Sequence, residues 1–560
     1  MFVDANDLDQ HIRADVAIVG TGACGLAMAT SFLERGMTVA LLETGGLERS
    51  SEAEHLTKAE LRGTLPVWIR SRARFLGGST NNWGGNNSPL DAVDFARDWV
   101  PHAQWPIGID DLTPYAEHVH DLFHLGPVDF STETWQERIP RLRDRILFAG
   151  SDRVATKLIQ RTHVGHLGQS LERVLDSAQN LSVYLHAHVT RIDVDEAGER
   201  VTGMEVTSLD RSRRHSVEAD QYVLAAGPEN TRLLLANRHQ HRNGVGNAHG
   251  QVGKWWIGHV SSLRGWIEPN ADLDWSFYDS SDKPVGDIRV FGALHVSEKV
   301  QREEKMLNSA AILEHFNPLM AFNNRARVIS SVKGMLGRPS ESLESQQLKP
   351  ELLVSAARDV SSAGRLLAAE KIRTRRGEPA RIGVRNWCEQ FPHPDNRVEL
   401  SHEVDDFGMP KMRVVSNLYP EDRDNLRRAF DVLGNEFEAY GYGRWISDFP
   451  LGDDWPAGAI NTSHFMGGTR MSESAENGVV DKDCRVHGMS NLSIAGGSVF
   501  PTAGVSMVTY TAVLLALRTA ERIAGTVPLA KPEPTKIVPR PDVPAVIPPE
   551  GAMGVMSLDR

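Results

Sequence analysis

Residues 15–25 read DVAIVGTGACG, and residues 39–43 read VALLE. The first run is an apolar strand that ends in the spacing G-x-G-x-x-G. The second run is another apolar strand, and it ends in an acid. The segment between them has the length and composition of a helix, so the sequence predicts a strand, a tight turn, a helix and a second strand. This order is typical of a cradle for a dinucleotide.

Each glycine of this turn has its own purpose. Gly20 permits the sharp turn after the strand, Gly22 lets the backbone approach a pyrophosphate, and Gly25 lets the helix pack against the sheet. The helix N-terminus then faces the phosphates. Glu43 follows Gly25 by 18 residues, at the end of the second strand, where a carboxylate accepts hydrogen bonds from ribose hydroxyls. Because a carboxylate there disfavours a 2′-phosphate, we do not expect NADP at this site.

This motif alone does not distinguish FAD from NAD. A second run, YVLAAGP at residues 222–228, is followed by Asn230, Thr231 and an apolar helix. It looks like the strand and turn that return to the same cofactor in flavoproteins, with Ala226 and Gly227 in the turn. An ordinary strand that ends in a glycine turn has the same appearance, so both interpretations stay open on this segment alone.

Two further segments resemble the glucose–methanol–choline (GMC) oxidoreductases. Residues 75–85 read FLGGSTNNWGG and are similar to the flavin-proximal loop of that family. The family's C-terminal motifs follow in order: HFMGGTRM at 464–471, GVVD at 478–481, CRVHG at 484–488 and SVFPT at 498–502. WPI at 105–107 and PDNRVEL at 394–400 are similar to the branch that acts on sugars and polyols, which includes pyranose oxidases.

The resemblance implies an α/β fold with two domains: a Rossmann-like FAD-binding domain and a second, α+β substrate-binding domain. The motifs divide the FAD-binding domain among residues 1–100, 155–255 and 455–525, and leave residues 101–154 and 256–454 for the substrate-binding and cap regions. Beyond Gly20, Gly22, Gly25 and Glu43, the resemblance implies that FAD contacts Gly78, Asn81, Asn82, Val189 (through its backbone, at the adenine), Ala226, Gly227, Gly497, Val508 and Thr509.

One position bears on how the cofactor is attached. In pyranose oxidases the loop that matches residues 79–83 carries a histidine bonded covalently to the flavin, whereas this chain has Asn82. An amide is not a nucleophile. We therefore expect FAD to be bound non-covalently.

His464 occupies the position of the family's active-site histidine. The family's reaction needs a flavin N5 that accepts hydride from a carbinol carbon and a base that takes the hydroxyl proton. Imidazole suits the second task because its unperturbed pKa lies near working pH, so we expect His464 to be the base. For His259 a place near the cofactor and a purely structural role both stay open, and the sequence favours the structural role.

The second catalytic position of the family, usually His or Asn, falls on Met507, 43 residues after His464. A thioether does not titrate and does not donate a strong hydrogen bond. Three interpretations stay open: His464 acts alone, a neighbour such as Ser506 or Tyr510 supplies the hydrogen bond, or the usual reaction is altered.

These observations predict an FAD-dependent oxidoreductase that oxidises an alcohol of a sugar, glycoside, aminosugar or polyol and passes electrons to oxygen or another acceptor. A redox-neutral lyase of the same fold is one alternative, and the loss of the second catalytic residue is what favours it. A subunit that binds FAD chiefly to pass electrons on, or a degenerate structural homologue, is another. Fold alone does not separate these functions.

Composition agrees with a large enzyme. The 560 residues include 61 Lys and Arg against 73 Asp and Glu, and this net charge of −12 argues against a nucleic-acid partner. The three cysteines give neither a disulfide framework nor a metal-binding spacing. An acidic N-terminus without an apolar core predicts no secretory signal, and no apolar run predicts a membrane span, so we expect a cytoplasmic protein.

Outside the motifs, the pattern of apolar residues predicts strands at 181–194, 255–266, 288–296 and 381–387. The first is expected in a smaller sheet. Residues 350–371 have the pattern of a helix with one exposed face, and the proline-rich residues 526–560 predict an extended tail.

Overall fold

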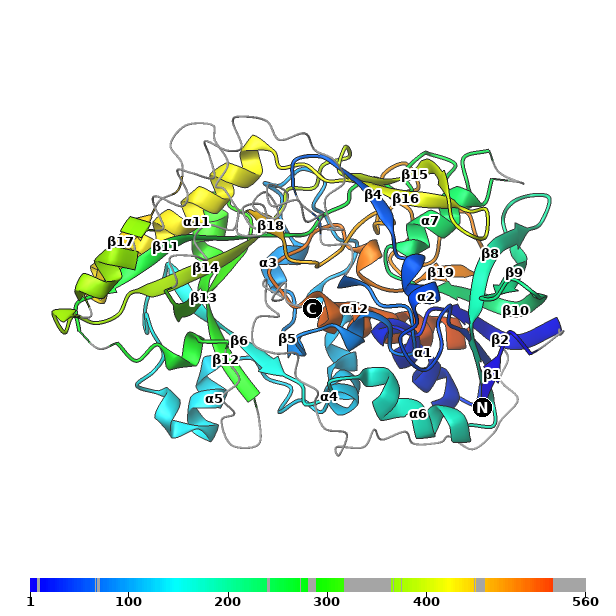
Figure 1. The fold of residues 1–560 in the computed structure, drawn as a ribbon, viewed down its shortest axis with the longest axis horizontal. Coiled ribbons are helices and arrows are strands. Elements are labelled where there is room, and N and C mark those ends of the chain that lie inside the picture. The colour runs from blue at the N-terminus through cyan, green and yellow to red at the C-terminus, as the bar shows by residue number, and fades with distance from the viewer. Residues whose placement is uncertain are drawn as a thin grey trace, which may run out of the picture.

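The structure is a computed structural model of the whole chain. It describes all residues except 8–10, 66, 68–70, 239–241, 272, 281–288, 317–363, 366, 374, 448, 450–458 and 527–560. The first sheet with helices α1 and α12 forms one half of the molecule, and the second sheet with helix α11 forms the other half (Figure 1).

The first sheet is built around the predicted cradle. Its strand order is β1 (Phe2–Asp4), β7 (Leu181–Leu185), β3 (Val39–Leu42), β2 (His11–Val19), β10 (Arg214–Leu224), β9 (Val201–Ser208) and β8 (Ala187–Val194), with β19 (Leu492–Ile494) paired to β10. The pairs among β1, β7, β3, β2, β10 and β19 are parallel, whereas β8 and β9 pair antiparallel. Residues 16–19 and 39–42 are buried, as expected for parallel strands that are covered on both faces.

Two long helices pack together beside this sheet. α1 (Ala23–Glu34) follows the glycine turn, and α12 (Val508–Ala524) lies against it. Both helices are apolar over most of their surface, because they are buried between the sheet and the rest of the molecule. The core that they share with the sheet also includes α4 (Ala116–Phe123), through Val119, Leu122 and Phe123.

The second sheet is antiparallel throughout. Its order is β17 (Gly443–Ser447), β11 (His259–Pro269), β14 (Ile382–Glu389), β13 (Ser309–His315), β12 (Arg289–Val296), β6 (Val154–Arg161) and β5 (Asn86–Asn87), with β18 (Ile460–Asn461) paired to β11. Helix α11 (Pro420–Ala439) packs on this sheet through Leu426, Phe430 and Phe437. A three-stranded sheet of β15 (Arg397–Val404), β16 (Pro410–Val415) and β4 (Ala59–Arg62) completes the fold.

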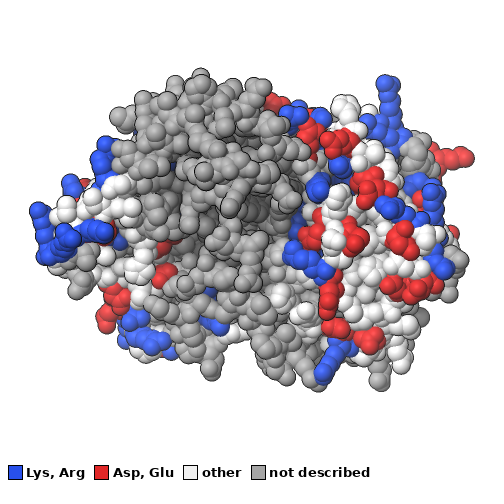
Figure 2. Space-filling view, in the orientation of Figure 1, with Lys and Arg blue, Asp and Glu red and all other residues white. Residues whose placement is uncertain are grey.

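Six further α-helices are named among the residues that the structure describes. They are α2 (Ser51–His55), α3 (Ala92–Phe95), α5 (Thr132–Arg138), α6 (Leu167–Ser177), α7 (Glu229–Ala236) and α8 (Glu298–Glu303). On the face shown in Figure 2, acidic and basic side chains of the described surface are intermixed over the half that contains the first sheet. Within the described part of the chain, we find no helix with the length and hydropathy that a membrane span requires.

Two strand predictions were wrong in detail. The run 181–194 forms two strands of the main sheet, β7 and β8, because His186 adopts a left-handed conformation (φ 53°) that turns the chain between them. The run 255–266 becomes a strand only at His259: Trp255 has a positive φ of 65°, and Ile257 forms an isolated bridge to Met466 instead. Alternation of apolar residues continues through both interruptions, so it does not reveal them.

The expected domain boundaries also differ from the placement of three segments. β5 and β6 lie in the second sheet, although residues 86–87 and 155–161 were expected in the FAD-binding domain. Conversely, α4 belongs to the core of the first sheet. Of the helix predicted at 350–371, residues 350–363 lie outside the described residues and 367–371 are helical. The predicted tail lies outside the described residues from residue 527 onward.

Candidate active site

The glycines of the turn before α1 face two different environments. A β-carbon on Gly25 would lie 2.0 Å from the carbonyl oxygen of Gly20, and one on Gly20 would lie 2.8 Å from that of Ala225, so both glycines are required by the packing of the chain. A β-carbon on Gly22 would meet no atom of the described residues within 4 Å. Gly22 is the N-cap of α1 and has an ordinary φ of −65°. Its missing side chain therefore keeps open the space at the helix N-terminus, where a pyrophosphate would bind.

Other predicted cofactor residues gather around this turn. A β-carbon on Gly78 would lie 3.0 Å from the Cα of Gly22, so the loop at residues 75–85 reaches the glycine turn. Gly227, directly after Ala226, also faces space that no described residue fills within 4 Å. Because Gly20 contacts the backbone of Ala225, the turn after β10 adjoins the same place. This arrangement of open glycines fits a dinucleotide.

Glu43 is buried at the end of β3 with its carboxylate held by the chain. Its Oε2 accepts a hydrogen bond from the backbone N–H of Thr21 at 3.2 Å and another from the Thr21 hydroxyl. Its Oε1 accepts from the N–H of Gly45 at 3.0 Å. A carboxylate offers about four acceptor sites, so one remains for a ribose hydroxyl.

Asn81 and Asn82 are both engaged within the protein. Nδ2 of Asn81 donates to two carbonyl oxygens of its own loop at 2.9 and 3.0 Å, and Oδ1 lies 3.1 Å from Nδ1 of His166. Asn82 accepts from Arg49 at 2.8 Å and donates to the carbonyl oxygen of Ser71 at 3.0 Å. In this structure the two amides shape the loop.

The remaining cofactor candidates lie in two places. Val189 is buried in β8 at a bulge in its pairing with β9. Val508 and Thr509 form the first turn of α12, where backbone N–H groups have no acceptor within the helix and can serve a ligand. A β-carbon on Gly497 would lie 2.9 Å from Cγ1 of Val508 and 3.1 Å from the carbonyl oxygen of Phe465. Gly497 thus joins the start of α12 to the loop that carries His464.

The loop of His464 is fixed by its backbone. Residues 257 and 466 exchange two backbone hydrogen bonds of 3.0 and 3.1 Å. A β-carbon on Gly467 would lie 1.8 Å from the carbonyl oxygen of Trp255, so this close approach requires glycine. Ser463, directly before His464, has a φ of 66°, which residues other than glycine rarely adopt. Such backbone strain is concentrated at functional sites.

His464 is paired with His259. Their Nδ1 atoms lie 2.7 Å apart, and the two rings are almost perpendicular, at 86°. His259 is fully buried at the first residue of β11, whereas His464 is partly exposed. Burial and the neighbouring His259 lower the pKa of His464 to about 3, and burial lowers the pKa of His259 to about 4. Both rings are therefore neutral near pH 7, the state that a general base requires.

Met507 lies in an apolar environment. It is 5% exposed and belongs to a cluster formed by Ile159, Phe291, Ala293, Ala310, Ile312, Trp387 and Val505. Of the neighbours considered as substitutes, the Tyr510 hydroxyl is hydrogen-bonded to Nε2 of His120 at 2.9 Å. The buried Ser506 hydroxyl has no hydrogen-bond partner among the described residues. Tyr510 is thus already engaged, whereas Ser506 is not.

Sequence reasoning missed a buried ion-pair network beside this site. Arg97 donates to Asp94 and to Glu389, and the side chains of all three are fully buried. Oε1 of Glu389 accepts from the backbone N–H of Ala503 at 3.0 Å, which holds the segment next to His259. Burial raises the pKa of Asp94 to about 6. No local pattern could have revealed this network, because Arg97 and Glu389 are 292 residues apart.

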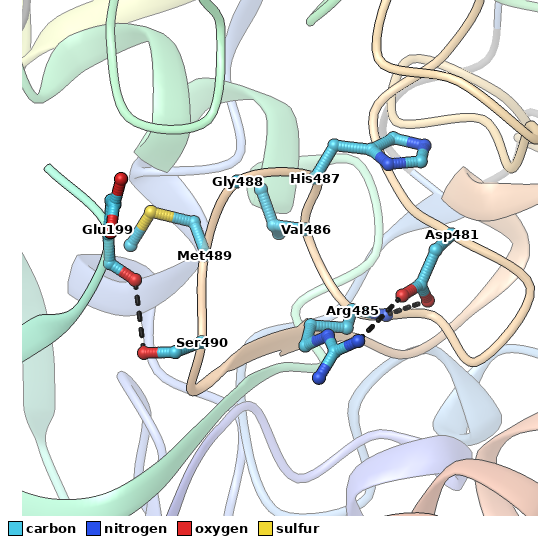
Figure 3. A pocket seen from close by; sticks show the side chains of 8 residues that line it. All are labelled: Glu199, Asp481, Arg485, Val486, His487, Gly488, Met489 and Ser490. Atoms are coloured by element: carbon cyan, nitrogen blue, oxygen red, sulfur yellow. Dashed lines mark hydrogen bonds and ion pairs between the residues drawn. The ribbon is translucent and has the colours of Figure 1, made fainter.

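A separate surface hollow lies at residues 481–490. It is lined by side chains of that loop, among them Asp481, Arg485 and His487, and by Glu199 (Figure 3). Arg485 pairs with Asp481 at 3.3 Å. The predicted site residues are not among those that line this hollow.

Comparison with known proteins points to one family. Residues 392–516 match the protein-family model described as GMC oxidoreductase. The C-terminal part of the chain is thus similar to the GMC oxidoreductases. The whole chain is 24% identical over 568 aligned residues to the 6'''-hydroxyparomomycin C oxidase of Streptomyces lividus, covering 91% of each chain. It is 34% identical over 145 residues to the C-glycoside 3-oxidase of Arthrobacter globiformis, an alignment that covers 26% of this chain and 27% of that one.

A solved structure has a similar fold. The pyridoxine 4-oxidase of Mesorbium loti superposes with a TM-score of 0.53 at 17% identity, covering 91% of this chain and 98% of that chain. A likeness at this identity shows the fold alone. The fold class predicted from the sequence is thereby confirmed. The match of residues 392–516 bears out the predicted resemblance to the GMC family, and that family implies a flavin as cofactor.

Proposed function

We propose that this protein is a GMC oxidoreductase that binds FAD non-covalently and oxidises a CH–OH group of a sugar, glycoside, aminosugar or polyol, with His464 as the base. The observation that carries the proposal is the state of the His464 ring. Its Nδ1 is engaged by His259, and within the described residues its Nε2 makes no hydrogen bond. The ring is neutral and partly exposed, so Nε2 is available to a substrate hydroxyl.

The chemistry divides between cofactor and protein. Bound FAD supplies the hydride acceptor, N5 of its ring. His464 takes the proton of the substrate hydroxyl at Nε2, so the electron pair of the O–H bond can form the carbonyl as the hydride leaves the carbon. The tight backbone of residues 463–467 holds the imidazole in place during this transfer.

We assign the parts of FAD to the residues that gather around the glycine turn. Gly20, Gly22 and Gly25 with the N-terminus of α1 would hold the pyrophosphate, Glu43 the ribose, and the backbone of Val189 the adenine. The residues proposed to lie nearer the flavin are Gly78, Asn81, Asn82, Ala226, Gly227, Gly497, Val508 and Thr509. The flavin-binding domain would then consist of the first sheet with α1, α4 and α12, and the second sheet would form the substrate-binding domain.

The substrate class rests on the relatives and on one residue of this chain. The relatives named above are oxidases of an aminoglycoside and of C-glycosides. Met507, at the second catalytic position, lies in an apolar environment. Either the unpaired hydroxyl of Ser506, a described neighbour, supplies the second hydrogen bond to the substrate, or His464 acts alone. Oxygen or another small-molecule acceptor would reoxidise the flavin.

Anaerobic reduction of the flavin tests the proposal. Purified holoenzyme is mixed without oxygen with aminoglycosides, C-glycosides, free sugars and polyols in turn, and the flavin absorbance near 450 nm is followed. Bleaching with one of these classes is expected. A turnover product without bleaching would indicate a redox-neutral lyase, and neither bleaching nor product would favour an electron-transfer subunit. Oxygen uptake with the reactive substrate then distinguishes an oxidase from a dehydrogenase.

A further inference from the structure

The contact between His259 and His464 constrains where each ring carries its proton. The two Nδ1 atoms are 2.7 Å apart, the distance of a hydrogen bond, so one must donate and the other must accept. A neutral imidazole carries one N–H and one lone pair. The tautomer of one ring therefore determines the tautomer of the other.

The far side of the His259 ring decides which tautomer it adopts. Nε2 of His259 lies 3.4 Å from the carbonyl oxygen of Ala503. A carbonyl oxygen can accept but cannot donate, so Nε2 of His259 carries the hydrogen. Its Nδ1 consequently presents a lone pair to His464.

We infer that His259 is a positioning residue that fixes His464 in the tautomer with Nδ1 protonated and Nε2 free to accept a proton. This inference rests on the proposed role of His464 as base. The opposite assignment would direct a lone pair of His259 at the carbonyl oxygen of Ala503. It would also place a hydrogen on Nε2 of His464, which could then not take the hydroxyl proton.

The surroundings hold His259 in this orientation. Its side chain is fully buried, so it acts through His464 and does not touch substrate. Its backbone carbonyl accepts from the N–H of Thr462 at 3.0 Å, which ties the start of β11 to the loop of His464. The preceding Gly258 donates its N–H to Oε1 of Gln390 at 3.1 Å. The ring therefore has a fixed place between the two groups that it bonds.

The carbonyl of Ala503 is fixed in turn by hydrogen bonds that residues 502 and 503 make to both halves of the molecule. The N–H of Ala503 donates to Glu389 at the end of β14, and the Thr502 hydroxyl accepts from the indole of Trp105 at 2.7 Å. Glu389 itself is held by the buried Arg97. A chain of contacts thus runs from the ion-pair network through Ala503 and His259 to His464. The tautomer of the base is set by groups that it does not touch.

Two substitutions of His259 separate a hydrogen-bond role from a packing role. In His259→Asn, the amide oxygen takes roughly the place of Nδ1 and can accept from His464, although it cannot reach Ala503. In His259→Leu, the shape is largely kept and the acceptor is lost. We expect the Leu variant to reduce its flavin roughly 100-fold more slowly, and the Asn variant to stay within about 10-fold of the wild type, with similar KM values. Flavin content and melting temperature are measured for both variants.

A direct measurement on the wild-type holoenzyme does not depend on how the variants fold. With 15N-labelled histidine, the signals of His464 are assigned by their loss in His464→Gln. We expect a protonated Nδ1 and an unprotonated Nε2 for this ring near pH 7. A protonated Nε2 would overturn the inference, and so would equal reduction rates in well-folded His259→Leu and His259→Asn variants. If instead His464→Ala reduces its flavin at the wild-type rate, the proposed function itself fails.

Discussion

Gly22 and Gly78 are in backbone contact, although one belongs to the glycine turn and the other to the loop at residues 75–85. A β-carbon on Gly78 would lie 3.0 Å from the Cα of Gly22. Two motifs of the sequence thus converge on one place at the N-terminus of α1. Within the turn, Gly22 faces open space, whereas Gly20 and Gly25 are required by the packing of the chain. Substitutions at these two kinds of glycine should therefore have different effects.

Gly22→Val is expected to fold but to lose FAD. The conformation of Gly22 is accessible to any residue, and no described atom lies within 4 Å of its β-carbon position, so the new side chain projects into the space for the pyrophosphate. The measurement is the ratio of flavin to protein after purification, together with circular dichroism. Gly25→Ala is the contrasting variant, because its β-carbon would meet the Gly20 carbonyl at 2.0 Å and disturb the fold itself. Full flavin occupancy in Gly22→Val would show that the cradle is assigned wrongly.

Mild acid is expected to release FAD from the wild-type protein. Asn82 is not a nucleophile, and both ends of its amide are hydrogen-bonded to Arg49 and Ser71. After acid precipitation, the yellow colour should therefore remain in the supernatant at about one FAD per chain. Colour in the pellet would mean that another residue forms a covalent bond to the flavin.

His464→Ala is expected to slow anaerobic flavin reduction by roughly two to four orders of magnitude, the usual effect of losing a general base. The flavin should stay bound, because the cradle residues lie elsewhere in the chain. His487→Ala is a suitable control, since His487 lines the separate hollow of residues 481–490 (Figure 3). The control should reduce its flavin at the wild-type rate. An unchanged rate in His464→Ala would exclude this histidine as the base.

The reduction rate is expected to be independent of pH over the neutral and mildly acidic range. The active form of His464 is the neutral ring, and its folded-state pKa is lowered from 6.5 to about 3, so the rate is retained well below pH 6.5. It should decline only as the pH falls toward that lowered pKa and Nε2 becomes protonated. Stopped-flow reduction at saturating substrate measures this profile. A half-maximal rate near pH 6.5 would show that the ring titrates as an exposed histidine.

Met507→Leu is expected to be nearly silent, because the two side chains are close in volume and Met507 packs among apolar residues. Met507→Asn would bury an amide in the same cluster, which costs about 1–3 kcal/mol of stability when the amide finds no partner. Thermal unfolding and flavin reduction are measured for both variants. If Asn speeds flavin reduction with free sugars, position 507 faces the substrate as the family's second catalytic residue does. An inactive Leu variant would give the sulfur atom a role that packing does not explain.

The sequence predicted those parts of the molecule that depend on local spacing. The glycine turn, α1 and β3 lie within 30 residues, and the order of the C-terminal motifs was enough to name the family. The boundary between β7 and β8 was missed because His186 makes a left-handed turn without glycine. The partner of His464 was missed for a different reason: His259 is 205 residues away, and no local pattern relates the two. The catalytic roles of His464 and Met507 remain predictions.

The ion-pair network beside Ala503 has a consequence for the order in which the protein folds. Its contacts and those next to it join residues 205, 292 and 397 positions apart, so they close very long loops and form late in folding. Ala503 must leave the ribosome before it can meet Glu389 and His259, which lie 114 and 244 residues earlier in the chain. Nascent chains and C-terminal truncations that stop before residue 503 therefore contain the whole glycine turn but lack the carbonyl group that orients the base. Activity is then expected only after these last contacts have formed.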